Sequence, residues 1–185
     1  KAIQAIGRVP RELHPRSELR YYIDADELDV TVQAFSFPET IVPLTQTIQQ
    51  AIRDRIPDSG RAGVLFSGGL DSSLIAKVLK DAGAHVTLYV AALDDPAKKT
   101  PVDLAQARSA AKALGLPLVE VRASLDEVQG LLASICEAIE DSNVVKVGVA
   151  LPLWLCCRQA RQDGQRVMFS GLGAEEVFAG YERHK

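Results

Sequence analysis

The sequence contains few of the residues that cross-link a chain or bind metal. Its 185 residues include three cysteines, Cys136, Cys156 and Cys157, without a C-x-x-C spacing, and adjacent cysteines are badly placed for an ordinary disulfide. Zinc requires about four ligands, and the three histidines are scattered singly along the chain. We therefore expect reduced thiols and no zinc site, with one redox-sensitive thiol as the alternative.

Membrane-spanning and targeting patterns are also missing. The longest uncharged stretch, residues 147–157, is far shorter than the roughly 20 residues of a membrane helix, and no basic-then-apolar leader is visible. Neither sign of charge dominates, because 21 Lys and Arg residues stand against 24 Asp and Glu residues, for a net charge of -3. No overall positive field would recruit nucleic acid or an anionic membrane. We expect a cytoplasmic protein with neither as a partner.

The composition is that of an ordinary globular protein, with 47% hydrophobic and 24% charged residues. Residues 1–60 are interrupted by prolines, alternate in a way that suggests a short hairpin at 20–32, and end in a helical pattern at 42–56. We interpret them as an amino-terminal arm, whose hairpin edge could pair with a second copy in a homodimer. Residues 61–185 form the predicted main domain.

In the main domain, short apolar runs alternate with helical patterns. Strands are predicted at 62–66, 86–91, 117–121 and 166–169, and helices at 71–82, 100–115, from 124, at 151–162 and from 174. The helical spacing predicts that Leu74, Leu125 and Leu132 face the core. Such alternation is typical of an α/β fold with an open parallel sheet and helices on both faces.

The first unusual junction between strand and helix has the sequence S-G-G-L-D-S-S at residues 67–73. Two glycines let the backbone turn, the helix that follows presents free N–H groups, and three serines add hydroxyl donors, which together predict a phosphate cradle. It is not a Walker A loop, because it lacks the lysine. Asp71 would repel an anion unless a cation such as Mg²⁺ lies between them. The structural alternative is a turn in which Asp71 caps the helix.

The second junction, S-G-L-G-A-E-E at residues 170–176, also follows an apolar run and precedes a helical pattern. Glycines flank Leu172, and two carboxylates fall in the first turn, where the helix dipole would favour them without any function. Ligands of open α/β sheets bind at the carboxyl ends of the strands. We therefore expect both junctions to contribute to one site.

Both segments resemble signatures of one protein family. S-G-G-L-D-S-S resembles the pyrophosphate-binding sequence of N-type ATP pyrophosphatases, and S-G-L-G-A-E-E-V-F-A-G-Y is similar to the S-G-x-G-A-D-E-x-F-G-G-Y segment of asparagine synthetases and β-lactam synthetases. The resemblance covers about residues 60–181, including an E-x-x-[DN]…P stretch at Glu140, Asn143 and Pro152. It implies the adenine-nucleotide α-hydrolase-like (HUP, Rossmann-like) fold. It also implies a ligase that adenylates a small carboxylate with ATP, releases pyrophosphate and lets an amine displace AMP.

The resemblance also implies roles for individual residues. It assigns the pyrophosphate of ATP to Ser67, Gly68, Gly69, Asp71, Ser72 and Ser73, and the rest of the nucleotide to Leu65, Val90, Ser170 and Gly171. Asp71 and Glu175 would share the Mg²⁺ ion and act as the catalytic pair. Tyr181 would close the local fold or simply pack in the core.

The sequence departs from the family pattern at three positions. Glu175 replaces the usual Asp, Leu172 replaces a Glu, and Gly148 stands near the place of an Arg for which Lys146 is a loose substitute. Nucleotide binding is therefore kept better than substrate recognition. The extension that supplies a catalytic lysine and the glutaminase domain have no counterpart in the sequence, so nitrogen is expected from free ammonia or a separate amidotransferase.

Three function classes remain in competition. The first is an AMP-forming amide ligase without its own glutaminase. The second is a tRNA-modifying or sulfur-transferring ATP pyrophosphatase, which the net charge of -3 and the vicinal cysteines support little. The third is a nucleotide-binding accessory or regulatory protein, which Leu172 and Gly148 favour.

Overall fold

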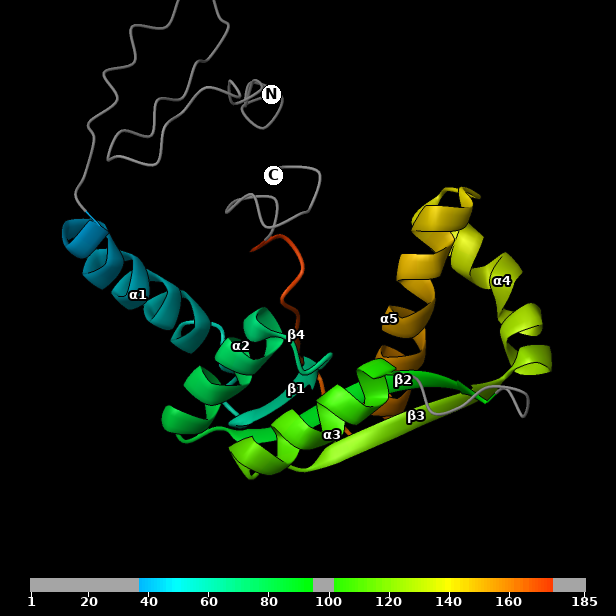
Figure 1. Cartoon of the computed structure of the whole chain (residues 1–185). Coiled ribbons are helices and arrows are strands. Elements are labelled where there is room, and N and C mark those ends of the chain that lie inside the picture. The colour runs from blue at the N-terminus through cyan, green and yellow to red at the C-terminus, as the bar shows by residue number, and fades with distance from the viewer. Residues whose placement is uncertain (1–36, 95–101, 175–185) are drawn as a thin grey trace, which may run out of the picture. The chain divides into compact units, whose positions relative to one another are not determined.

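The computed structural model describes residues 37–94 and 102–174 (Figure 1). The chain divides into two compact units, Lys1–Gln50 and Ala51–Lys185. The predicted hairpin at 20–32 lies outside the described residues. The sheet and its helices belong to the second unit, which is the subject of the following paragraphs.

The main unit has the predicted alternation of strands and helices. In chain order the elements are α1 (Phe37–Arg53), β1 (Arg61–Leu65), α2 (Leu70–Asp81), β2 (His85–Asp94), α3 (Val102–Leu114), β3 (Leu118–Ser124), α4 (Leu125–Ile139), α5 (Val144–Gln162) and β4 (Met168–Phe169). All strand pairs are parallel, in the order β3-β2-β1-β4. The predicted open parallel sheet is therefore confirmed, and its order is that of a doubly wound fold.

Helices cover both faces of this sheet. The chain moves outward from β1 to β2 and β3 through α2 and α3, then returns through α4 and α5 to β4 on the other side of β1. Because crossovers between parallel strands are right-handed, the reversal of direction places the two helix pairs on opposite faces. On the α5 face, a core cluster joins the buried side chains of Tyr89 and Val121 to those of Leu155 and Cys156.

The helix starts follow their capping residues. Ser124 caps α4, where its Oγ accepts a hydrogen bond from the Glu127 amide at 3.2 Å. Asn143 caps α5, accepting from the Val145 amide at 3.0 Å, so α5 begins at Val144 and not at residue 151 as predicted. Pro152 lies inside this helix and does not start it.

Three apolar side chains predicted to face the core are exposed instead. Leu74 on α2 and Leu132 on α4 are solvent-exposed, and Leu125, the first residue of α4, is 57% exposed. Periodicity placed them on the apolar side of each helix, but the buried stripes are narrower and centre on residues such as Leu79 and Ile135. Among the described residues, no helix is long and apolar enough to cross a membrane.

Candidate functional site

The loop between β1 and α2 turns sharply at the carboxyl edge of the sheet. The Phe66 amide still pairs with the Tyr89 carbonyl of β2 at 2.8 Å, after which the chain leaves the sheet. Gly68 has a φ of +77°, a left-handed conformation that favours glycine. The Gly69 amide then donates to Ser67 Oγ at 3.2 Å. The predicted S-G-G turn therefore connects the strand directly to the helix.

The first turn of α2 has no side-chain cap, because its N-cap residue is Gly69. The serines interact with one another and with the turn: Ser72 Oγ lies 3.3 Å from Ser67 Oγ and donates to the Gly69 carbonyl at 3.3 Å. Ser72 is buried, whereas Ser67 is exposed. An uncapped helix start beside hydroxyl donors is a suitable binding site for an anion such as phosphate.

Helix α3 supports this loop from one side. A Cβ atom at Gly68 would lie 2.8 Å from both the Cα and the backbone N of Ala107, so no larger residue fits there. Gln106 Nε2 donates to the Gly68 carbonyl at 3.2 Å. Gly68 is therefore required both by its backbone conformation and by the close approach of α3.

The second predicted loop lies directly against the first. It follows β4, which pairs with β1, and within it the Leu172 amide donates to Ser170 Oγ at 3.1 Å. A Cβ atom at Gly171 would lie 2.9 Å from Asp71 Cβ and 3.1 Å from the Ser72 amide nitrogen. The two loops thus meet beside β1, where the chain reverses its direction through the sheet. Such switch points are the usual ligand sites of open α/β folds.

The remaining predicted residues occupy the same edge or lie outside the described residues. Leu65 is opposite Tyr89 in the register of β1 and β2, and the buried Val90 follows on β2. Glu175 and Tyr181 fall in a part of the chain that the structure does not describe. The structure therefore brings together the β1 loop, Leu65 and the start of the β4 loop, with Val90 on the neighbouring strand.

Asp71 lies in the first turn of α2 and is half-buried. Within residues 37–94 and 102–174 its carboxylate makes no hydrogen bond or ion pair, and no group of three or more potential metal ligands occurs in that part of the chain. Magnesium is often held by one or two carboxylates together with substrate phosphates, so a single unpaired carboxylate beside a phosphate cradle fits Mg²⁺ that arrives with a nucleotide.

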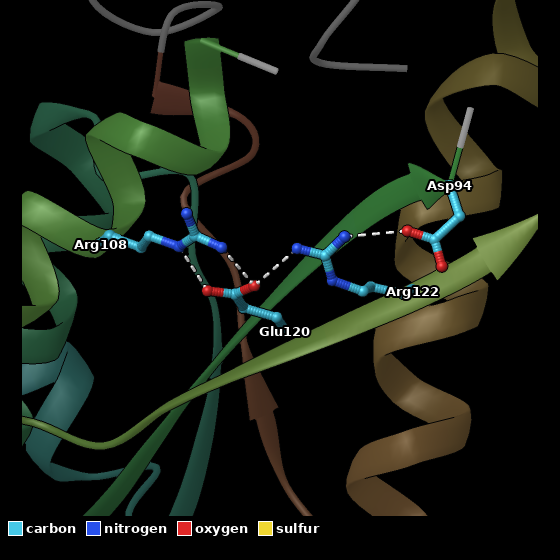
Figure 2. Close-up of polar contacts among 4 residues, drawn as sticks. All are labelled: Asp94, Arg108, Glu120 and Arg122. Carbon is cyan, nitrogen blue, oxygen red and sulfur yellow. Dashed lines mark hydrogen bonds and ion pairs between the residues drawn. The ribbon is translucent and has the colours of Figure 1, made fainter. Parts of the chain in front are cut away.

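Sequence reasoning missed a chain of ion pairs beside this site (Figure 2). Arg108 of α3 binds both carboxylate oxygens of Glu120 on β3, at 2.6 and 2.8 Å. Arg122 contacts Glu120 at 3.3 Å and Asp94 of β2 at 2.9 Å. The hydrogen bonds from Arg108, and then those from Arg122, lower the pKa of Glu120. No local sequence signal identifies this cluster, because its members come from one helix and two strands.

Comparison with known proteins gives one consistent result. Residues 43–185 match the asparagine synthase family. The putative glutamine-hydrolyzing asparagine synthetase 1 of Methanocaldococcus jannaschii is 31% identical, over 95% of this chain and 33% of that protein. Asparagine synthetase 1 of Saccharomyces cerevisiae is 28% identical, over 79% of this chain and 30% of that protein. The chain thus spans about a third of the length of these curated relatives.

Solved structures with a related backbone were also found. The NMN synthetase of Francisella tularensis superposes with a TM-score of 0.44 and 20% identity, covering 64% of this chain and 50% of that one. A predicted tRNA methyltransferase subunit of Methanocaldococcus jannaschii superposes with a TM-score of 0.39 and 23% identity, covering 60% of this chain and 52% of that one.

Proposed function

The chain belongs to the asparagine synthase family, and from that premise we propose that it binds Mg·ATP where β1 and β4 end and uses it to activate a small carboxylate. The observation that carries this proposal is the contact of the two signature loops at Gly171 and Asp71. The loops are about a hundred residues apart in sequence, as residues 67–73 and 170–174. Their meeting leaves an uncapped helix start, two hydroxyls and a free carboxylate together.

The β1 loop would hold the phosphates. The amides of the first turn of α2 and the hydroxyls of Ser67, Ser72 and Ser73 would donate to phosphate oxygens, while Leu65, Val90, Ser170 and Gly171 would border the adenine and ribose. Bound Mg²⁺ would neutralise the charge between Asp71 and the phosphates. We propose Glu175 as a second carboxylate toward that ion.

The proposed reaction has two steps. An oxygen of the substrate carboxylate attacks the α-phosphorus of ATP, so the bond to the β-phosphate oxygen breaks and pyrophosphate leaves. Ammonia then attacks the acyl carbon, and AMP leaves as the amide forms. No side-chain nucleophile is needed, because positioning and electrostatic stabilisation by the loops carry the catalysis. Ammonia would be free or would come from a separate amidotransferase, and the carboxylate could be aspartate or another small acid.

A nucleotide-binding accessory role is the second candidate. Leu172 is 65% exposed in the β4 loop, at the position where related synthetases carry a glutamate. An exposed leucine cannot bind a polar substrate group through a hydrogen bond or a charge. Nucleotide binding without turnover would follow if that glutamate is essential for the substrate.

The decisive assay supplies ATP, Mg²⁺, ammonia and a panel of amino acids, and measures AMP and pyrophosphate. Release of both with aspartate supports an asparagine-forming ligase, and release with another acid keeps the class and changes the substrate. Release only with tRNA would favour the tRNA-modifying class. Tight ATP binding without turnover would support the accessory role.

Asp71→Ala tests the nucleotide site itself. We expect ATP affinity in calorimetry to fall at least about tenfold with Mg²⁺ present, the loss typical even of residues that only support a metal ligand, and to change less without Mg²⁺. Asp81→Ala at the other end of α2 is the matched control, because Asp81 pairs with the exposed Lys77 away from the loop. Equal ATP affinity of Asp71→Ala and the unchanged chain in Mg²⁺ would refute the assignment.

A further inference from the structure

The phosphate loop is oriented by a residue of α3. Gln106 Nε2 donates to the Gly68 carbonyl at 3.2 Å. That carbonyl and the N–H of Gly69 belong to the same planar peptide group, so fixing the oxygen also fixes the direction of the N–H. The fully buried Ala107 closes the space beside Gly68 with its own backbone. A shift of α3 relative to the sheet would therefore reorient the loop.

The position of α3 is in turn tied to the sheet by Arg108, which follows these two residues directly. Its Nε and Nη2 bind the two oxygens of Glu120, which occupies a register position opposite Val90 (Figure 2). Two parallel hydrogen bonds from a planar guanidinium fix orientation as well as distance. Arg122 holds Glu120 from the other side and reaches Asp94, so the tie extends to the carboxyl ends of β2 and β3.

We propose that the Arg108–Glu120 pair positions the phosphate loop: it holds α3 at the distance from β3 at which Gln106 and Ala107 fix the Gly68–Gly69 peptide. This inference rests on the proposed nucleotide function of that loop. Arg108 is a positioning residue in this scheme and does not itself bind the nucleotide, because Glu120 already engages its Nε and Nη2.

The pair is suited to positioning more than to stability. The Arg108 and Glu120 side chains are 46% and 24% exposed, and ion pairs open to solvent contribute little to the free energy of unfolding. Breaking the pair should therefore leave the fold intact and change the loop locally. This separation of effects makes the proposal testable.

The test compares Arg108→Glu, Glu120→Arg and the double exchange, which restores an opposite-charge pair. We expect each single variant to bind ATP about threefold to fivefold more weakly, the range of one exposed ion pair, and the double variant to recover most of that loss. In Arg108→Glu the affinity for adenosine should not change, since adenosine lacks the phosphates that the loop holds. A purely structural role would instead lower both affinities together with the midpoint of urea unfolding.

Hydrogen exchange of residues 66–69 provides a readout that needs no nucleotide. We expect faster exchange of this segment in both single variants and recovery in the double variant, with no change for β4. Lys77→Glu is the control, since it breaks the exposed pair with Asp81 on α2 without touching α3.

The outcomes separate this inference from the function on which it rests. If the unchanged chain fails to bind ATP, the proposed function is wrong, and the exchange rates alone decide whether the pair positions the loop. If ATP binds but the single variants alter neither the affinity nor the exchange of residues 66–69, the positioning role is overturned. Failure of the double exchange to recover affinity would also overturn it, since that result indicates direct contact of Arg108 with ATP.

Discussion

The two faces of the sheet use different contacts for different purposes. On the α5 face, Tyr89 packs with Leu155 and Cys156 in an apolar cluster, and its hydroxyl donates to Asp163 at 2.9 Å. That hydrogen bond lies near the start of β1, because Arg61 donates to the Asp163 carbonyl. On the other face, α3 makes its close contact with Gly68 and its ion pair with Glu120 toward the carboxyl ends of the strands.

This difference teaches how the fold separates stability from position. Apolar clusters contribute free energy in proportion to buried area and tolerate small displacements, whereas a backbone contact or a two-pronged ion pair fixes a distance. Burial raises the pKa of the Cys156 thiol to about 12, which marks the α5 cluster as dry and this thiol as unreactive. The α5 face should therefore determine stability and the α3 face the geometry of the loops.

The largest effect on stability is expected on the α5 face. Leu155→Ala removes a fully buried side chain from the cluster, which should lower the free energy of unfolding by about 2 to 5 kcal/mol in urea titration. The folded fraction should still bind ATP with unchanged affinity. Leu132→Ala on the exposed side of α4 is the control and should cost little. Comparable losses of stability in the two variants would contradict the assigned role of the cluster.

On the α3 face, Gly68→Ala should affect binding more than folding. Its Cβ would lie 2.8 Å from the backbone of Ala107 and would require a φ of +77°, so the loop must move. We expect ATP affinity to fall on the order of a hundredfold, as for a displaced binding group, and stability by about 1 to 3 kcal/mol.

Gly83→Ala separates backbone strain from steric contact. Gly83 has a similar φ of +81°, but a Cβ there would meet nothing within 4 Å. This control should lose stability and keep its ATP affinity. If Gly68→Ala behaves in the same way, the contact with α3 does not determine the loop.

Much of this division could be predicted from the sequence, and its limits have physical reasons. The alternation of apolar runs and helical patterns predicted the parallel sheet, and two glycine-rich junctions predicted which loops meet. Periodicity cannot tell whether a neighbouring element covers an apolar side chain, which is why Leu74, Leu125 and Leu132 were placed in the core although they are exposed.

The ion pairs and the close contact at Gly68 were beyond sequence reasoning for a different reason. Arg108 and Glu120 are 12 residues apart, and neither carries a motif. Their meeting depends on the crossing of α3 over β3, which no local pattern specifies. The early start of α5 was missed because Gly148 and Pro152 look like helix breakers, while Asn143 caps the helix before them.

A smaller effect should follow removal of the Tyr89 hydroxyl. Burial, and then the hydrogen bond to Asp163, raise the pKa of Tyr89 from 10.0 to about 12, so folding favours the neutral phenol. Tyr89→Phe should lower the free energy of unfolding by about 1 kcal/mol below pH 10 and leave ATP affinity unchanged. The difference from the unchanged chain should shrink as the pH rises toward 12. A difference that grows over this range would contradict the shift.

The smallest effect is expected in acid on the α3 face. The folded-state pKa of Glu120 is lowered from 4.5, mainly by the hydrogen bonds from Arg108, so its contribution is complete above the unfolded-state pKa and is lost as the pH falls through the lowered value. Unfolding of Glu120→Gln and of the unchanged chain should therefore differ slightly at neutral pH and converge in acid. A gap that persists in strong acid would show that the carboxylate charge is not involved.

The bare start of α2 has a consequence for handling the protein at the bench. Because Gly69 offers no side chain to the first turn, the amides there are available to any small oxyanion in the solution. Phosphate and sulfate would then act as competitors in every titration, and high concentrations of either would raise the melting temperature by occupying the cradle. Storage in such a buffer would protect the fold, whereas affinity measurements are better made in a zwitterionic buffer with chloride as the counterion.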